Sequence, residues 1–164
     1  MMQMQLLIRT TDPTYNPNGL DDYLREQEEE EIKALNEIYR PLEADLLDII
    51  VHTLSQQFGE RWFTDGVPLK VKTEVIAEQD KDKSKSYEQC FTLPTHAKLI
   101  MQANSPMFQA VLQTGDLKWL DKLIEVRNGI SHAPYKIEPN YRDFLVNVVR
   151  RKLNKGKQNM DLAP

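Results

Sequence analysis

PLEADLLDIIVHTLSQQFG, residues 41–59, is the stretch of the sequence that decides the fold. Its apolar side chains recur every three or four positions, which is the period of one face of an α-helix. They are Leu42, Leu46, Leu47, Ile49, Ile50 and Leu54. Proline is favoured at the first position of a helix and glycine commonly follows the last, so Pro41 and Gly59 mark the expected ends. We predict a core helix here.

The segment before this helix, LDDYLREQEEEEIKALNEIY at residues 20–39, has the same period. Its apolar members are Leu20, Tyr23, Leu24, Ile32, Leu35 and Ile38. They predict a separate amphipathic helix, and the acidic run from Glu28 to Glu31 is expected on its solvated side. An acidic strip that binds a partner is the alternative. Residues 9–19, RTTDPTYNPNG, favour turns, so residues 1–19 are expected to be a loose leader.

After the core helix, turn signals alternate with helical patterns. The GVP turn at residues 66–68 precedes a predicted helix through Val71, Val75 and Ile76, and the polar run at 81–86 predicts a loop. Two short helices are expected to follow, the first capped by Thr95 and the second opened by Ser105 and its neighbouring proline.

Two longer helices are expected near the C-terminus. Asp116 is expected to cap the first, which stops at Asn128-Gly129, and Pro139 opens the last, which runs to Lys157 before a flexible tail at 158–164. No internal repeat or period-two strand pattern occurs. The sequence therefore predicts an all-α bundle of four or five main helices with short extra helices, forming a single domain over residues 20–157.

Composition limits the classes of function. The chain has 164 residues and a net charge of −4, divided into −8 over residues 1–50 and +4 over residues 51–164. The basic second part leaves room for a phosphate-binding surface. No stretch approaches the roughly 18 apolar residues of a membrane span, and the single cysteine fits a reducing compartment. We expect a cytoplasmic protein that binds no membrane.

The residue types that could carry a cofactor or metal are sparse. No P-loop, GxGxxG or GxSxG motif occurs, which argues against nucleotide-triphosphate and dinucleotide chemistry. No metal-ligand spacing joins His52, Cys90, His96 and His132. We therefore expect no metal and no cofactor. His52 is expected to be packed or at the surface, His96 exposed and Cys90 a small buried residue.

Polar side chains gather where one apolar helix is expected to end, in LIEVRNGISHAP at residues 123–134. In an unbroken helix Arg127 and His132 would lie about 140° apart around the axis and would not point together. A break at Gly129 removes that restriction. Arg127, Asn128 and His132 are then expected to meet at one rim of the bundle.

The sequence Arg127-Asn128-Gly129-Ile130-Ser131-His132 resembles the R-N-x-x-x-H signature of the HEPN superfamily. ERWF at residues 60–63 and GVP at 66–68 are similar to one set of HEPN domains, and the resemblance extends from about Arg40 to Lys155. It implies a helical bundle that dimerises so that two motifs face each other. Many such domains are metal-independent endoribonucleases, and the resemblance also suggests a toxin or antiviral defence effector.

The chemistry of RNA cleavage suits these residue types. The resemblance implies that His132 acts as general base or acid when a ribose 2′-hydroxyl attacks the adjacent phosphate, which yields a 2′,3′-cyclic phosphate. Arg127 would hold the phosphate and stabilise transition-state charge, and Asn128 would orient one of these groups. Lys136 and Arg142 are the expected substrate phosphate contacts, since they lie nearest the motif in sequence.

Other readings of the same residues stay open. Arg127 and His132 are alternatively a structural pair that satisfies helix-end carbonyls. Trp62 and Trp119 are expected to be core or interface aromatics, with base stacking on RNA as the alternative. The chain as a whole is alternatively a non-catalytic dimerisation or protein-interaction module, such as the terminal domain of a larger protein. A third alternative is an antitoxin-like protein that binds its partner through residues 28–31.

Overall fold

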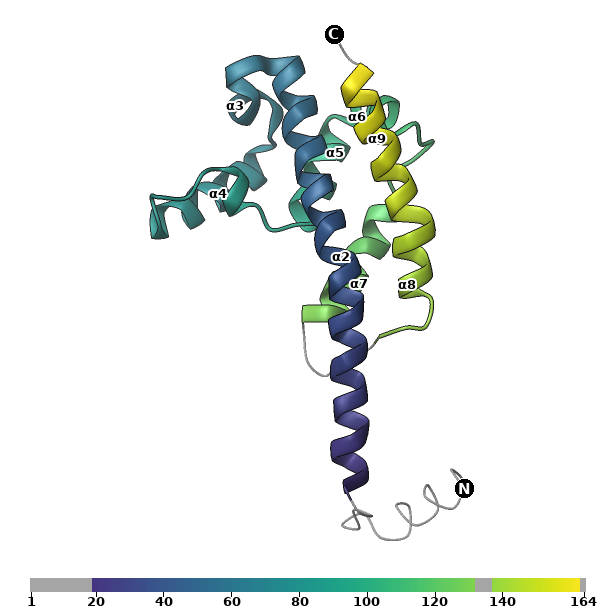
Figure 1. The fold of residues 1–164 in the computed structure, drawn as a ribbon. Coiled ribbons are helices and arrows are strands. Elements are labelled where there is room, and N and C mark those ends of the chain that lie inside the picture. The colour runs from purple at the N-terminus through teal and green to yellow at the C-terminus, as the bar shows by residue number, and fades with distance from the viewer. Residues whose placement is uncertain (1–18, 132–136, 163–164) are drawn as a thin grey trace. The chain divides into compact units, whose positions relative to one another are not determined.

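The computed structural model describes residues 19–131 and 137–162, and within those ranges its regular secondary structure is entirely helical, with no strand (Figure 1). The all-α prediction is confirmed. Its elements are α2 (Leu20–Phe58), η2 (Gly59–Arg61), α3 (Trp62–Gly66), α4 (Leu69–Lys81), η3 (Glu88–Cys90), α5 (Thr95–Ala103), α6 (Ser105–Leu112), α7 (Trp119–Ser131), α8 (Tyr141–Phe144), η4 (Leu145–Val149) and α9 (Arg150–Leu162). Residues 1–18 of the expected leader lie outside the described residues. His132 and Lys136 lie outside them as well.

Helix α2 is one continuous helix with Pro41 inside it, so the prediction of two helices meeting at Pro41 is wrong. Proline has no N–H to donate to the carbonyl four residues earlier, which belongs to Glu37. Both residues are exposed, so water can bind that carbonyl. The buried stripe also continues on either side, through Tyr39 and Leu42, and its packing favours an unbroken helix.

The contacts divide the chain into two compact units, residues 1–34 and 35–164. In the first unit all side chains from Asp21 to Glu31 are exposed. Two contacts within it are local: Arg25 pairs with Asp22, and the Gln27 amide donates to the Tyr23 hydroxyl at 2.8 Å. The buried hydrophobic core begins at Leu35, in the second unit.

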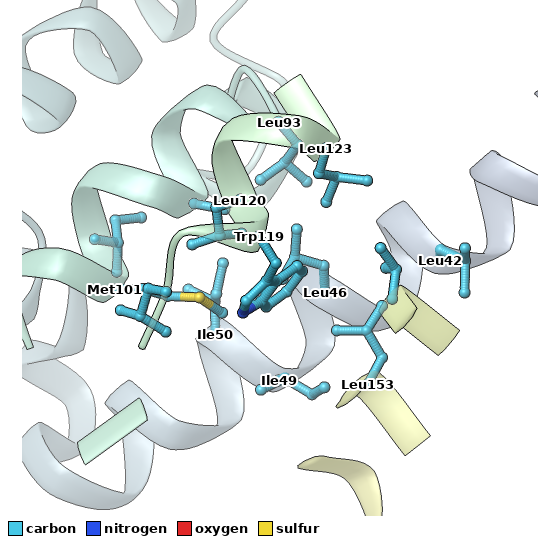
Figure 2. Packing of buried hydrophobic residues seen from close by; sticks show 14 of the residues in the cluster. Leu42, Leu46, Ile49, Ile50, Leu93, Met101, Trp119, Leu120, Leu123 and Leu153 are labelled. Atoms are coloured by element: carbon cyan, nitrogen blue, oxygen red, sulfur yellow. The ribbon is translucent and has the colours of Figure 1, made fainter. Parts of the chain in front are cut away.

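The core of the second unit gathers around the middle of α2. Figure 2 shows Leu46, Ile49 and Ile50 of α2 together with Trp119 and other side chains of α7 and α9. The three α2 residues have no exposed surface, and Trp119 is 8% exposed. Trp119 is therefore a core aromatic, as predicted. Trp62 is half-buried against Phe63 and Phe91, and Cys90 is buried.

Helix α9 runs beside α2 and packs closely against it and α6 (Figure 1). A Cβ atom at Gly156 would lie 2.8 Å from Leu112 Cδ2 and 2.9 Å from Ile49 Cδ1, so the glycine permits this approach. The Lys157 ammonium also donates to Asp45 at 3.0 Å. Helix α9 extends to Leu162, five residues beyond the predicted helix end at Lys157.

One π-helical turn, η4, joins α8 to α9. At its end the Arg150 N–H donates to the Leu145 carbonyl, five residues back. The buried residues Tyr141, Leu145, Val149 and Leu153 are spaced four apart. In a regular α-helix such a series would drift by about 40° at each step, and a wider turn reduces that drift. The π turn thus helps to keep both flanking helices against the core.

Among the other predicted helix ends, the one at Gly59 is confirmed and the cap at Thr95 is wrong. Gly59 follows α2 with a φ of +61°, and the Asp116 carboxylate accepts the N–H of Lys118 at 2.9 Å just before α7. Thr95 begins α5 but does not cap it, because the residue before the helix is Pro94 and no side-chain cap forms there.

His96 satisfies the backbone at this helix start, and the expectation that it is exposed is wrong. It is 2% exposed. The N–H of Thr92 donates to His96 Nδ1 at 2.9 Å, so Nδ1 carries no proton and Nε2 donates to Glu74 Oε2 at 2.5 Å. The hydrogen bond from His96 lowers the pKa of the Glu74 carboxyl. This side chain therefore ties α4 to α5.

We expect the substitution Glu74→Gln to lower the melting temperature at pH 7, and this difference to fade in acid. A carboxyl whose pKa is lowered by folding contributes stability above its ordinary pKa of 4.5, and that stability is lost as the pH falls through the lowered value. Thermal melts of both proteins across this range test the expectation. Glu60→Gln removes an exposed carboxylate and is the control. A difference that widens in acid would contradict the assignment.

Candidate functional site

Helix α7 carries the first five residues of the R-N-x-x-x-H sequence and continues through Gly129 to Ser131. The predicted break at Gly129 is therefore wrong. Glycine weakens a helix by about 1 kcal/mol relative to alanine, but packing offsets such a cost. Val126 is buried and Ile130, one turn later, packs against the core, so the last turn is anchored on both sides of the glycine.

Arg127 of α7 lies within electrostatic reach of Tyr39 of α2. Its side chain is half-buried, and its charge acts on the Tyr39 hydroxyl of α2. Burial raises the pKa of Tyr39, the neighbouring Glu43 carboxylate raises it further, and the Arg127 guanidinium opposes both. A guanidinium, a carboxylate and a phenol thus share one region of the second unit.

The polar groups of this region are incompletely paired within the described part of the chain. Tyr39 is 4% exposed, and its hydroxyl has no hydrogen-bond partner there. No ion pair joins Arg127 to another described residue. The guanidinium is therefore available to hold an anion, because its planar group offers five hydrogen-bond donors.

The other predicted site residues occupy different positions. Asn128 is exposed beside Arg127, and Arg142 is exposed on α8. Tyr141, the neighbour of Arg142, is buried; burial and the Glu125 carboxylate of α7 raise its pKa to about 12, with Glu138 adding to the effect. The structure thus brings the start of α8 close to the motif helix. His132, which was predicted to meet Arg127 and Asn128, and Lys136, a predicted phosphate contact, lie outside the described residues.

The aromatic and basic side chains near α9 are partly committed to the fold. Lys152 donates to the Thr114 hydroxyl at 2.9 Å and lies 6.0 Å from the centre of the Trp119 ring. Because Trp119 is buried, the alternative of base stacking on RNA is wrong for that residue. Arg150, Arg151 and Lys155 are exposed.

The described residues contain no group of three or more histidine, cysteine, aspartate or glutamate side chains placed to hold a metal ion. His52 is half-buried, and its Nε2 has no hydrogen-bond partner in the described ranges. None of the helices in residues 19–131 and 137–162 combines the length and apolar character needed to span a membrane.

Sequence reasoning missed Tyr39 and Glu43. These residues are four positions apart, so they lie on one face of a helix. The four-residue spacing is visible in the sequence, but it places the two side chains together only if the helix continues through Pro41. The predicted helix boundary at Pro41 assigned Tyr39 and Glu43 to different helices. Comparison with protein-family models, with curated proteins and with solved structures gave no match.

Proposed function

We propose that the protein is a metal-independent endoribonuclease of HEPN type, with a composite active site formed between two copies of the chain. The observation that carries this proposal is the position of Arg127. It is half-buried on a core helix, within electrostatic reach of Tyr39 and without an ion pair to another described residue. A cation at the edge of a core, with donors to spare, suits a phosphate ligand.

In the proposed reaction one copy of His132 takes the proton of a ribose 2′-hydroxyl, and the 2′-oxygen attacks the adjacent phosphorus. The bond from phosphorus to the 5′-oxygen breaks, and an imidazolium returns a proton to that leaving oxygen. The products carry a 2′,3′-cyclic phosphate and a 5′-hydroxyl. Arg127 stabilises the charge that builds on the phosphoryl oxygens, while Asn128 orients the reacting groups.

Binding of the RNA strand is assigned to Lys136 and Arg142. Arg142 is exposed on α8, next to Tyr141, which packs near Glu125 of the motif helix. An arginine there adds affinity through the phosphate backbone without reading sequence. The biological role that we propose is that of a toxin or an antiviral defence effector.

The test is incubation of the purified protein with a mixed RNA pool in EDTA. Cleavage is expected to persist, because neither the nucleophile nor the proton transfers use a metal, and the fragments are expected to end in 2′,3′-cyclic phosphate. Protein with His132→Ala, prepared identically, is the blank for contaminating ribonucleases. Cleavage that EDTA abolishes, or fragments that carry a 3′-hydroxyl, would overturn the mechanism.

The second candidate function is a non-catalytic interaction module. The separate first unit favours it, because its helical residues 21–31 are exposed and strongly acidic. A folded wild-type protein that leaves the RNA pool intact would favour this function over the ribonuclease.

A further inference from the structure

The two units of the chain carry opposite charge on exposed helices. Residues 20–34 contain seven acidic and two basic residues, for a net charge of −5. Residues 141–162, which form α8, η4 and α9, contain six basic and two acidic residues, for a net charge of +4. Such complementarity steers two surfaces together.

The acidic helix has one mixed face that we call the acidic seam: Leu24, Glu28 and Glu31. These positions are spaced by four and three residues and therefore lie along one side of the helix. Leu24 is 42% exposed, and both glutamates are exposed. Neither glutamate has an ion pair with another described residue. The seam combines an uncovered apolar group with two available carboxylates.

The basic helix has a matching face that we call the basic seam: Val148, Arg151 and Lys155. Val148 is 38% exposed, and the two cations are exposed and have no ion pair within the described ranges. Lys152 and Lys157, in contrast, bond to Thr114 and Asp45. The order along the chain is the same as in the acidic seam, apolar first and charges after.

We propose that the acidic seam of one copy packs on the basic seam of a second copy. Both seams are exposed within the single chain, and the acidic seam belongs to a unit that the contacts separate from residues 35–164. Residues 20–34 of α2 precede its first buried core residue, Leu35, so such a contact would also stabilise this part of the helix. The apolar residue in each seam favours a protein surface over an RNA strand as the occupant.

This interface is independent of the proposed nuclease chemistry. Each copy offers one acidic and one basic seam, so the contact joins two unlike surfaces of the two copies. When the helices run in the same direction, Leu24 meets Val148 and the glutamates meet Arg151 and Lys155. The association should weaken as salt rises, since the screening length falls to about 3 Å at 1 M salt.

Charge reversal tests the proposal. We expect Glu28→Lys with Glu31→Lys, or Arg151→Glu with Lys155→Glu, to raise the dimer dissociation constant roughly tenfold or more, because like charges then meet at the interface. The two variants mixed together should form a heterodimer, since each reversed seam finds a complementary one. Sedimentation equilibrium measures the dissociation constant of each variant alone and of the mixture. The control, Glu26→Lys with Glu30→Lys, makes the same charge change at positions about 100–160° around the helix from the residues of the acidic seam.

A cysteine pair locates the contact directly. Protein with Leu24→Cys is mixed with protein with Val148→Cys under mild oxidation, and a disulfide-linked heterodimer is expected. The native Cys90 is buried and does not compete. Glu26→Cys in place of Leu24→Cys is the control. Three results would each overturn the proposed interface. The first is equal crosslinking by the control, and the second is the absence of a heterodimer when the charge variants are mixed. The third is an RNA fragment bound at the basic seam of a monomer.

Discussion

His132→Ala is expected to reduce the rate of RNA cleavage by about 10²- to 10⁴-fold, the range over which a positioned general acid or base acts. The imidazole is the one group of the R-N-x-x-x-H sequence that titrates near neutral pH, so alanine removes the proton transfer while Arg127 still binds phosphate. Single-turnover cleavage of one defined RNA, with enzyme in excess, separates this chemical step from binding.

The structural alternative for the same residue makes the opposite prediction. If His132 only satisfied helix-end groups, its alanine variant would melt at a lower temperature and keep its activity while folded. Ser131→Ala is the matched control, because Ser131 is exposed at the end of α7 and lies next to the histidine. Full activity in His132→Ala would remove the histidine from the mechanism, whatever its effect on stability.

Leu46→Ala is expected to lower the free energy of unfolding by about 2–5 kcal/mol. Leu46 has no exposed surface and sits in the packed centre of α2, near Trp119 and Leu153 (Figure 2). The truncated side chain leaves a cavity that these large neighbours fill only in part. Urea denaturation followed by circular dichroism measures the loss. At about 2–4 °C for each kcal/mol in a chain of this size, the melting temperature should fall clearly.

Leu69→Ala makes the same chemical change at an exposed position. Leu69 is 75% exposed at the start of α4, so its truncation is expected to change stability by no more than about 0.5 kcal/mol. Similar losses in the two variants would show that α2 is not the centre of the core.

Periodicity was sufficient to predict the core helix because its signal is long and regular. The apolar residues from Leu42 to Leu54 include four that are completely buried. The boundary at Pro41 was wrong because the rule that places proline at helix starts weighs only local geometry. The exposure of Glu37, and the burial of apolar side chains on both sides of Pro41, depend on tertiary structure, which the local rule does not include.

The candidate site was predictable only to the extent that it lies on one helix. Arg127 and Asn128 belong to a recognisable motif, whereas Tyr39 and Glu43 come from a segment more than eighty residues earlier. The burial of His96 was missed for a related reason. Its two ring nitrogens bond to Thr92 and Glu74, and Glu74 lies on another helix. Pairings between distant segments leave no periodic signature.

The π turn η4 bears on how the length of this chain can vary during evolution. A π turn holds about one more residue than an α turn, so the stretch Leu145–Val149 can lose a residue by tightening to regular α-helix. Tyr141 before it and Leu153 after it would still face the same core, with a modest rotation between them. In the middle of α7 a deletion would instead turn every later side chain by about 100°. Single-residue gaps should therefore be tolerated at η4 and selected against in α7.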